Sequence, residues 1–198
     1  MRTYFFENTS CYILAGGKSS RMGQDKGLMP IPDKTMVHLL TERVQSVFPS
    51  LKIVANNPAY NSFGYPVITD LKKDVGPAGG IHAALADSVH EQIFILSCDM
   101  PFVTLAGINH LMGYAENHDI VLPHYKGNAE PLFAMLNKRC LPLWTLAIDR
   151  GIFKLQDIMA NFNTLSLDVT TEVIFDKDFF FNVNTPEALE IAKQKLMK

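Results

Sequence analysis

The chain has 198 residues, which is the length of one ordinary domain. It is 47% hydrophobic and 19% charged, a mixture typical of a globular protein. Its formal net charge of −2 excludes a protein that attracts nucleic acid or an anionic membrane through an overall positive field. Any anionic ligand must therefore be held by local groups.

The cysteines are scattered along the chain at Cys11, Cys98 and Cys140, with no CxxC pair and no Cys/His cluster. This odd set argues against a disulfide scaffold or a zinc site and for a reducing compartment. No segment approaches the roughly 20 apolar residues of a membrane span. Residues 1–10 lack the charged and then apolar order of a secretion signal. We therefore expect a cytoplasmic protein whose partners include neither nucleic acid nor membrane.

Short apolar runs alternate with amphipathic stretches along the first two thirds of the chain. The runs predict strands at residues 11–15, 51–55, 65–68, 93–97 and 120–123, and the amphipathic stretches predict helices at 36–47, 81–89 and 104–116. The apolar runs are nearly continuous, which is typical of strands buried on both faces of a mostly parallel sheet. Pro49 stops the first helix and Thr104 is a suitable N-cap for the third. The alternation predicts an α/β fold in three layers.

The last third of the chain predicts a strand over 131–136, a helix over 138–148 and a segment over 168–175 that completes the sheet. Thr185 is a good N-cap for a final helix over 188–196, with Pro186 at the first helical position. Because no repeat, low-complexity tract or linker interrupts the sequence, we expect residues 1–198 to form a single domain.

A glycine-rich segment follows the first predicted strand over residues 14–27. Its adjacent Gly16 and Gly17 let the backbone approach a ligand and turn N–H groups toward an anion. Three cations follow in the same segment, namely Lys18, Arg21 and Lys26. The combination predicts a triphosphate cradle, and the alternative is a glycine-rich turn with solvated lysines.

Asp99 follows the predicted strand over 93–97. A carboxylate at the carboxyl end of such a strand lies on the edge where open α/β sheets bind ligands. It is also a hard oxygen donor that can complete octahedral Mg²⁺ coordination with triphosphate oxygens and water. Asp99 is therefore a candidate Mg²⁺ ligand, and the alternative is a cap near Pro101.

Other polar or glycine-rich positions follow predicted strands. Asn56 and Asp70 end two of them, where short polar residues usually only make turns. A glycine-rich stretch over 76–81, which contains Gly79, precedes the helix predicted at 81–89 and can also be a simple turn.

The pattern Leu-Ala-Gly-Gly-x-Ser-x-Arg-Met-Gly-x-Asp-Lys is similar to the signature of the nucleotidyltransferase superfamily that includes sugar-nucleotide pyrophosphorylases and cytidylyltransferases. It is not a P-loop, which needs glycine where Tyr12 stands, and it lacks the dinucleotide fingerprint. Residues 126–134 and 181–187 resemble the molybdenum cofactor guanylyltransferase (MobA) family. The resemblance extends over most of the chain, in five blocks in the expected order. It implies a three-layer αβα Rossmann-like fold of the nucleotide-diphospho-sugar transferase type.

The resemblance also implies the reaction, in which GMP passes from GTP to the phosphate of Mo-molybdopterin and pyrophosphate is released. Mg²⁺ is the implied cofactor. Proteins that deliver molybdopterin or mature molybdoenzymes are the implied partners. The nucleotide-binding half is expected at about residues 1–103 and the acceptor-side half at about 104–198.

Site residues follow from the resemblance position by position. The glycine loop wraps the triphosphate with Leu14, Ala15, Gly16, Gly17 and Lys18. Lys26 serves the α-phosphate, Arg21 holds the pyrophosphate end together with Lys18, and Asp99 binds the metal. These expectations make Lys26, Arg21 and Asp99 the catalytic set.

The remaining expected contacts concern the nucleoside and the acceptor. Gly79 belongs to the loop that closes over the nucleoside, and Asn56 and Asp70 are candidates for contacting base or ribose, with Asn57 a weaker alternative to Asn56. Asp70 suits the donor edge of guanine. Asn182 and Asn184 are expected near the metal or the acceptor phosphate, and the alternative is that they cap the last helix.

Sibling activities stay open at this point. A cytidylyltransferase for the same pterin or a sugar-phosphate nucleotidyltransferase is the nearest alternative, and residues 130–131 and 182–184 weigh against both. An alternative of another class is a non-catalytic, nucleotide-sensing subunit. The intact combination of Lys26, Asp99 and the glycine loop favours an enzyme.

Overall fold

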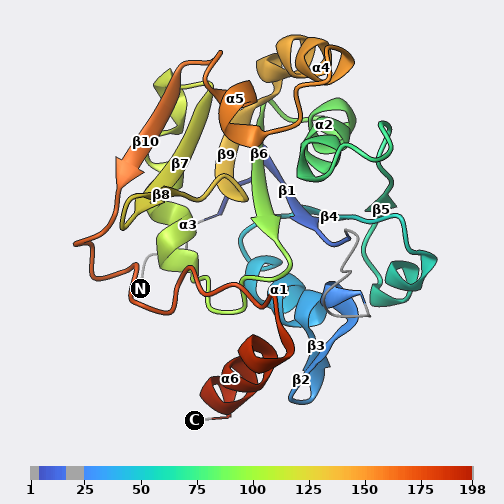
Figure 1. Cartoon of the computed structure of the whole chain (residues 1–198), viewed down its shortest axis with the longest axis vertical. Coiled ribbons are helices and arrows are strands. Elements are labelled where there is room, and N and C mark those ends of the chain that lie inside the picture. Colours follow the sequence, from blue (N-terminus) through green and yellow to red (C-terminus); the bar gives the residue numbers. More distant parts are fainter. Residues whose placement is uncertain (1–4, 17–24, 198) are drawn as a thin grey trace.

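The computed structural model describes residues 5–16 and 25–197. Within these residues the centre is an eight-stranded sheet with the order β10-β7-β9-β6-β1-β4-β5, in which β8 pairs with β7 (Figure 1). The strands are β1 (Thr9–Leu14), β4 (Ser50–Val54), β5 (Val67–Ile68), β6 (Gln92–Ser97), β7 (Ile120–Tyr125), β8 (Asn128–Ala129), β9 (Phe133–Asn137) and β10 (Thr164–Asp168). The expected mostly parallel α/β sheet is confirmed, with β9 antiparallel to both of its neighbours.

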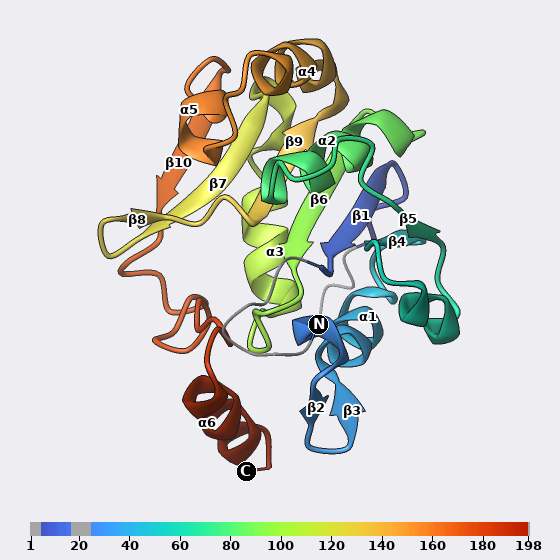
Figure 2. The ribbon, with the colours of Figure 1, turned by 45° about the vertical axis from the view of Figure 1, so that its right-hand side comes forward.

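The helices are α1 (Met36–Val44), α2 (Pro77–Asp87), α3 (Leu105–Met112), α4 (Leu141–Asp149), α5 (Leu155–Met159) and α6 (Pro186–Leu196). A separate hairpin is formed by β2 (Pro30–Ile31) and β3 (Lys34–Thr35). Helix α6 contacts strand β2 of this hairpin, and Figures 1 and 2 show the helix beside the hairpin. The helix N-caps expected at Thr104 and Thr185 are both present.

Both faces of the sheet are buried, which explains the continuous apolar runs. In β1, Cys11 and Ile13 pack into one core, together with α1 and α3, whereas Tyr12 packs into the other core, together with α2, α4 and α5. In β6, Phe94 and Ile95 likewise point to opposite cores. Since side chains alternate along a strand, a strand covered on both sides must be apolar at every position.

Several predicted boundaries differ in the structure. Helix α2 begins at Pro77, four residues before the predicted start at Ile81, because Gly76 at φ 62° turns the chain and proline suits the first helical position. The prediction of a sheet-completing segment over 168–175 is wrong. The edge strand β10 is Thr164–Asp168, and the residues after it turn so that Val169 and Phe175 enter the core.

Candidate functional site

A pocket of about 280 Å³ opens at the carboxyl ends of β1, β4 and β6. These strands are parallel neighbours, so their ends meet at one edge, where open α/β sheets bind ligands. We call this space the nucleotide pocket. It is lined by Leu14, Ala15, Gly16, Asp25, Lys26, Val54, Ala55, Asn56, Asp70, Gly76, Pro77, Gly80, Ser97, Cys98, Asp99 and Leu132.

Seven of the residues predicted from the sequence line this one pocket. They are Leu14, Ala15, Gly16, Lys26, Asn56, Asp70 and Asp99. Gly79 lies just behind the lining in the first turn of α2, where a Cβ would stand 2.9 Å from the carbonyl oxygen of Lys72. Gly80 lines the pocket in its place. Gly17, Lys18 and Arg21 lie outside the residues that the structure describes.

Lys26 reaches across the pocket to residues far away in sequence. Its Nζ lies 3.5 Å from Oδ2 of Asp99 and donates a hydrogen bond to Oδ1 of Asn184. The Ser97 hydroxyl donates to Oδ1 of Asp99 at 2.6 Å, so one carboxylate oxygen is oriented by its own strand and the other faces Lys26. The two charged side chains are 25% and 15% exposed, which leaves them open to a ligand in the pocket.

Asn56 and Asp70 form a pair on the β4–β5 side of the pocket. Nδ2 of Asn56 donates to Oδ2 of Asp70 at 3.0 Å, and the Asp70 amide donates back to Oδ1 of Asn56 at 3.1 Å. Burial raises the pKa of Asp70 above its usual range. Asn57, the weaker alternative, has a different task, since it caps Ala59 and donates to Asp25.

A second, open pocket of about 430 Å³ adjoins the first, and Pro77, Asp99 and Leu132 line both. We call it the acceptor pocket. Its other lining residues are Met100, Glu130, Pro131, Phe153, Leu155, Gln156, Asn182 and Asn184. Phe153 and Gln156 could not be found from the sequence, because residues 137–178 carry no recognisable motif.

The segment that carries Asn182 and Asn184 is fixed to the end of β6. The amide of Val183, which is fully buried, donates to the carbonyl oxygen of Asp99 at 2.9 Å. Thr185 accepts from the Ala188 amide and is the N-cap of α6. The capping alternative for the two asparagines is therefore not what the structure has, since the cap position belongs to Thr185.

Glu130 stands on the wall of the acceptor pocket. Burial, together with the negative charge of Asp99, raises the pKa of Glu130 to about 7. From the sequence, Glu130 was expected only as part of the segment that resembles the family. The sequence signal for this position is the Glu-Pro pair, since Glu130 and Pro131 begin a turn in which the Phe133 amide donates to the carbonyl oxygen of Glu130.

The donor set beside Asp99 fits a magnesium ion better than a metal held wholly by protein. Among residues 5–16 and 25–197 no group of three or more His, Cys, Asp and Glu side chains is gathered to hold a metal. Mg²⁺ characteristically uses one or two carboxylates and takes its other ligands from water and substrate phosphates. Asp99 lines an open pocket together with glycines and Lys26, and therefore meets that requirement.

Residues 11–164 match the family model of the MobA-like NTP transferase domain. The chain belongs to the MobA-like NTP transferase family. A probable molybdenum cofactor guanylyltransferase from Natranaerobius thermophilus is 33% identical over 97% of this chain and 98% of its own length. A molybdenum cofactor guanylyltransferase from Vibrio campbellii is 34% identical over 91% of this chain and 93% of its own.

Solved structures show the same architecture. Molybdopterin-guanine dinucleotide biosynthesis protein A from Archaeoglobus fulgidus has a TM-score of 0.83 and 27% identity, over 95% of this chain and 98% of that one. The 2-C-methyl-D-erythritol 4-phosphate cytidylyltransferase from Thermus thermophilus, at 10% identity and a TM-score of 0.71 over 96% and 98% of the two chains, shares the fold alone. The chain is a nucleotidyltransferase with the nucleotide-diphospho-sugar transferase fold. Within the described residues no helix is long and apolar enough to cross a membrane.

Proposed function

We propose that this protein is a molybdenum cofactor guanylyltransferase, which transfers GMP from GTP to Mo-molybdopterin and releases pyrophosphate. The observation that carries the proposal is the pair of adjoining pockets that share Asp99, with Lys26 and Asn184 in contact where they meet. A transfer between two substrates requires that both be held against the same reacting atom. The similarity to curated guanylyltransferases over nearly the whole chain supports the choice of this reaction.

In this proposal the nucleotide pocket holds GTP. Gly16 and the backbone around it lie against the triphosphate, and Lys26 lies at the α-phosphate, where its charge offsets the charge that develops during transfer. Lys18 and Arg21, which lie outside the described residues, are assigned to the pyrophosphate end. Asp70 faces the N1–H and N2–H₂ donors of guanine, with Asn56 holding its carboxylate in place.

Asp99 would hold Mg²⁺. The ion, when bound, would neutralise charge on the triphosphate oxygens. The Ser97 hydroxyl orients the Asp99 carboxylate by donating a hydrogen bond to its Oδ1. No general base is required, because the attacking phosphate of the acceptor is already ionised near neutral pH.

The acceptor pocket would take the molybdopterin phosphate and the atoms next to it. Asn182 and Asn184 offer amide donors beside Asp99, and the exposed ring of Phe153 offers an apolar wall. Among the described residues the lining of this pocket includes Glu130 and no cation, so we assign the orientation of the acceptor phosphate to the amides and to the metal side of the site. The free, buried thiols of Cys11, Cys98 and Cys140 accord with a reducing, cytoplasmic setting.

Calorimetric titration with GTP, CTP, ATP and UTP in the presence of Mg²⁺ tests the base assignment. We expect GTP to bind at least about tenfold more tightly than CTP, because a carboxylate pairs with the donor edge of guanine and leaves cytosine unmatched. The Asp70→Asn variant should narrow that preference while the protein keeps its melting temperature. Equal affinities in the unaltered protein would exclude the guanylyl assignment and leave the family assignment standing.

A further inference from the structure

Asp25, the residue before Lys26, is held by three hydrogen bonds. Its Oδ1 accepts from the Tyr60 hydroxyl and, at 3.2 Å, from the Gly27 amide, and its Oδ2 accepts from Nδ2 of Asn57 at 3.2 Å. Tyr60 and Asn57 belong to the turn that follows β4, more than thirty positions further along the chain. The carboxylate therefore joins the backbone around Lys26 to a separate part of the fold.

Tyr60 also lies close to Gly27, the residue on the other side of Lys26. A Cβ added to Gly27 would overlap the Tyr60 hydroxyl and stand 3.1 Å from two of its ring carbons. Only glycine lets the turn Lys26–Leu28 sit this close to the ring. Lys26 is thus flanked by two residues, Asp25 and Gly27, that are both seated on the same side chain.

Phenylalanine could fill the same place in the core as the Tyr60 ring, so what tyrosine adds is the hydroxyl that binds Asp25. The ring is fully buried and contacts Phe63, and a buried hydroxyl costs free energy unless it is hydrogen-bonded. Burial and the hydrogen bond to Asp25 raise the pKa of Tyr60, so the hydroxyl stays a neutral donor.

We propose that Tyr60 is a positioning residue for transfer, which acts through Asp25 to fix the backbone from which Lys26 reaches the α-phosphate. The inference rests on the role proposed above for Lys26. A lysine side chain has several rotatable bonds, and productive geometry in catalysis requires placement within about 0.5 Å. Fixing the backbone at Lys26 removes one source of error that the side chain itself cannot correct.

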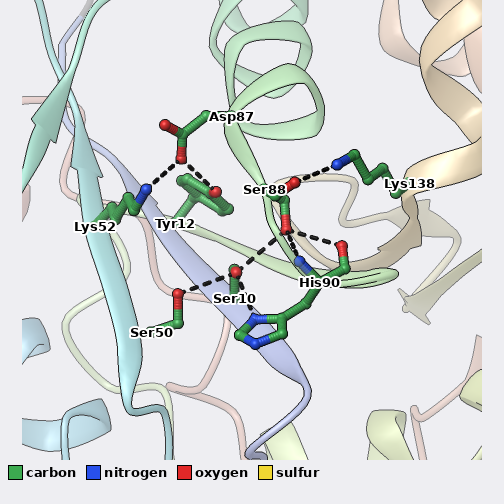
Figure 3. Close-up of polar contacts among 8 residues, drawn as sticks. All are labelled: Ser10, Tyr12, Ser50, Lys52, Asp87, Ser88, His90 and Lys138. Atoms are coloured by element: carbon green, nitrogen blue, oxygen red, sulfur yellow. Dashed lines mark hydrogen bonds and ion pairs between the residues drawn. The ribbon is translucent and has the colours of Figure 1, made fainter.

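The chain contains a matched control for Tyr60. Tyr12 is also fully buried, and its hydroxyl also donates to a carboxylate, Oδ2 of Asp87, at 2.7 Å. Figure 3 shows this pair with Lys52, which donates to the same oxygen. Asp87 is the last residue of α2, whose first residue Pro77 lines both pockets, so the carboxylate that Tyr12 holds lies about 15 Å of helix away from the site.

The test compares Tyr60→Phe with Tyr12→Phe, each in the unaltered protein and in the Lys26→Ala variant. We measure kcat and KM for GTP by pyrophosphate release with Mo-molybdopterin, and the thermal melt of each protein. Tyr60→Phe should lower kcat roughly tenfold with little change in KM, a loss of the size expected for a hydrogen bond to a charged group. In the Lys26→Ala background it should have no further effect on kcat. Tyr12→Phe should leave kcat unchanged in both backgrounds.

A second variant guards against a Tyr60→Phe protein that fails to fold. Asn57→Asp keeps a side-chain oxygen to cap the Ala59 amide but replaces the donor to Asp25 with a like charge. It should show the same fall in kcat and the same loss of effect in the Lys26→Ala background. An unchanged kcat in both variants, or an equal fall with and without Lys26, would overturn the inference. If Lys26→Ala itself leaves turnover unchanged, the proposed role of Lys26 fails first, and the inference fails with it.

Discussion

The Lys26 ammonium lies 3.5 Å from the carboxylate of Asp99, although the two residues are 73 positions apart in the sequence. One follows the first strand of the sheet and the other follows β6, its direct parallel neighbour. Without a nucleotide the two charges neutralise each other across the pocket. A triphosphate and its metal would separate them, since the phosphates attract Lys26 and the metal attracts Asp99.

Replacing Lys26 by alanine should lower kcat on the order of 10²-fold and change KM for GTP much less, because charge grows on the transferred phosphoryl group during reaction. Steady-state kinetics of pyrophosphate release measure this split. Lys52→Ala is the control, since Lys52 is also 25% exposed and ion-paired, at 2.7 Å from Asp87, away from both pockets. A change in KM alone would make Lys26 a uniform binding group.

Replacing Asp99 by asparagine should reduce pyrophosphate release on the order of 10³-fold, because asparagine keeps the shape but not the charge that a dehydrated Mg²⁺ requires. The melting temperature should change little, because asparagine can still accept from Ser97. Asp87→Asn provides a control at an ion-paired aspartate outside the site. Normal turnover with a normal melt would remove Asp99 from the metal site, and a collapsed melt would make it a structural residue.

The double variant Asn182→Ala/Asn184→Ala should slow transfer to Mo-molybdopterin while GTP binding measured by calorimetry stays nearly unchanged. Both asparagines line the acceptor pocket, and the buried Val183 between them still fixes their segment through its amide when both side chains are removed. Thr185→Ala is the comparison for helix capping. Loss of this N-cap should lower the free energy of unfolding by about 1 kcal/mol, which a thermal melt detects as a lower melting temperature. A double variant that transfers at the unaltered rate would contradict the acceptor assignment.

Stability should also depend on pH through His82, which lies outside both pockets. His82 is buried on α2, its Nε2 lies 3.0 Å from the Thr145 hydroxyl, and its Nδ1 has no hydrogen-bond partner in the described part of the chain. Burial, and next the charge of Lys72, lower the pKa of His82 from its ordinary value of 6.5. Below that pH the unfolded chain binds a proton that the folded chain resists, so the free energy of unfolding falls as pH falls.

His82→Gln keeps a donor for Thr145 and cannot titrate. Thermal melts between pH 7.5 and pH 5 should therefore show a smaller drop in melting temperature for this variant than for the unaltered protein. Identical pH profiles would mean that His82 is protonated in the fold without cost.

The mostly parallel sheet and most of the nucleotide pocket could be predicted from the sequence, because buried parallel strands leave long apolar runs and their carboxyl ends carry the polar residues. The edge strand β10 was misplaced since it pairs only with β7 and alternates Thr164, Ser166 and Asp168 with leucines, a weaker pattern than a central strand. The hairpin β2–β3, with two residues in each strand, and helix α5, with five, are too short for periodicity to detect.

Contacts between distant segments could not be predicted from the sequence. Nothing in residues 56–60 indicates that Asn57 and Tyr60 hold Asp25, while Asn56 lines the pocket. The contact of Lys26 with Asn184 likewise depends on how α6 packs against the β2–β3 hairpin through Met29, Ile31 and Ala192. Such pairings are set by tertiary packing, which leaves no local pattern.

The most direct test of the proposed function is mass spectrometry of the products formed from Mo-molybdopterin, Mg²⁺ and each of the four nucleoside triphosphates in separate reactions. The account predicts a guanine dinucleotide of molybdopterin, with one pyrophosphate released per product, from GTP and at most a trace of the corresponding product from CTP, ATP or UTP. The same reactions with the Asp99→Asn variant should give no dinucleotide. The proposed function would be contradicted if a cytosine dinucleotide formed as readily as the guanine one. It would also be contradicted if the folded protein, supplied with Mo-molybdopterin, left GTP intact.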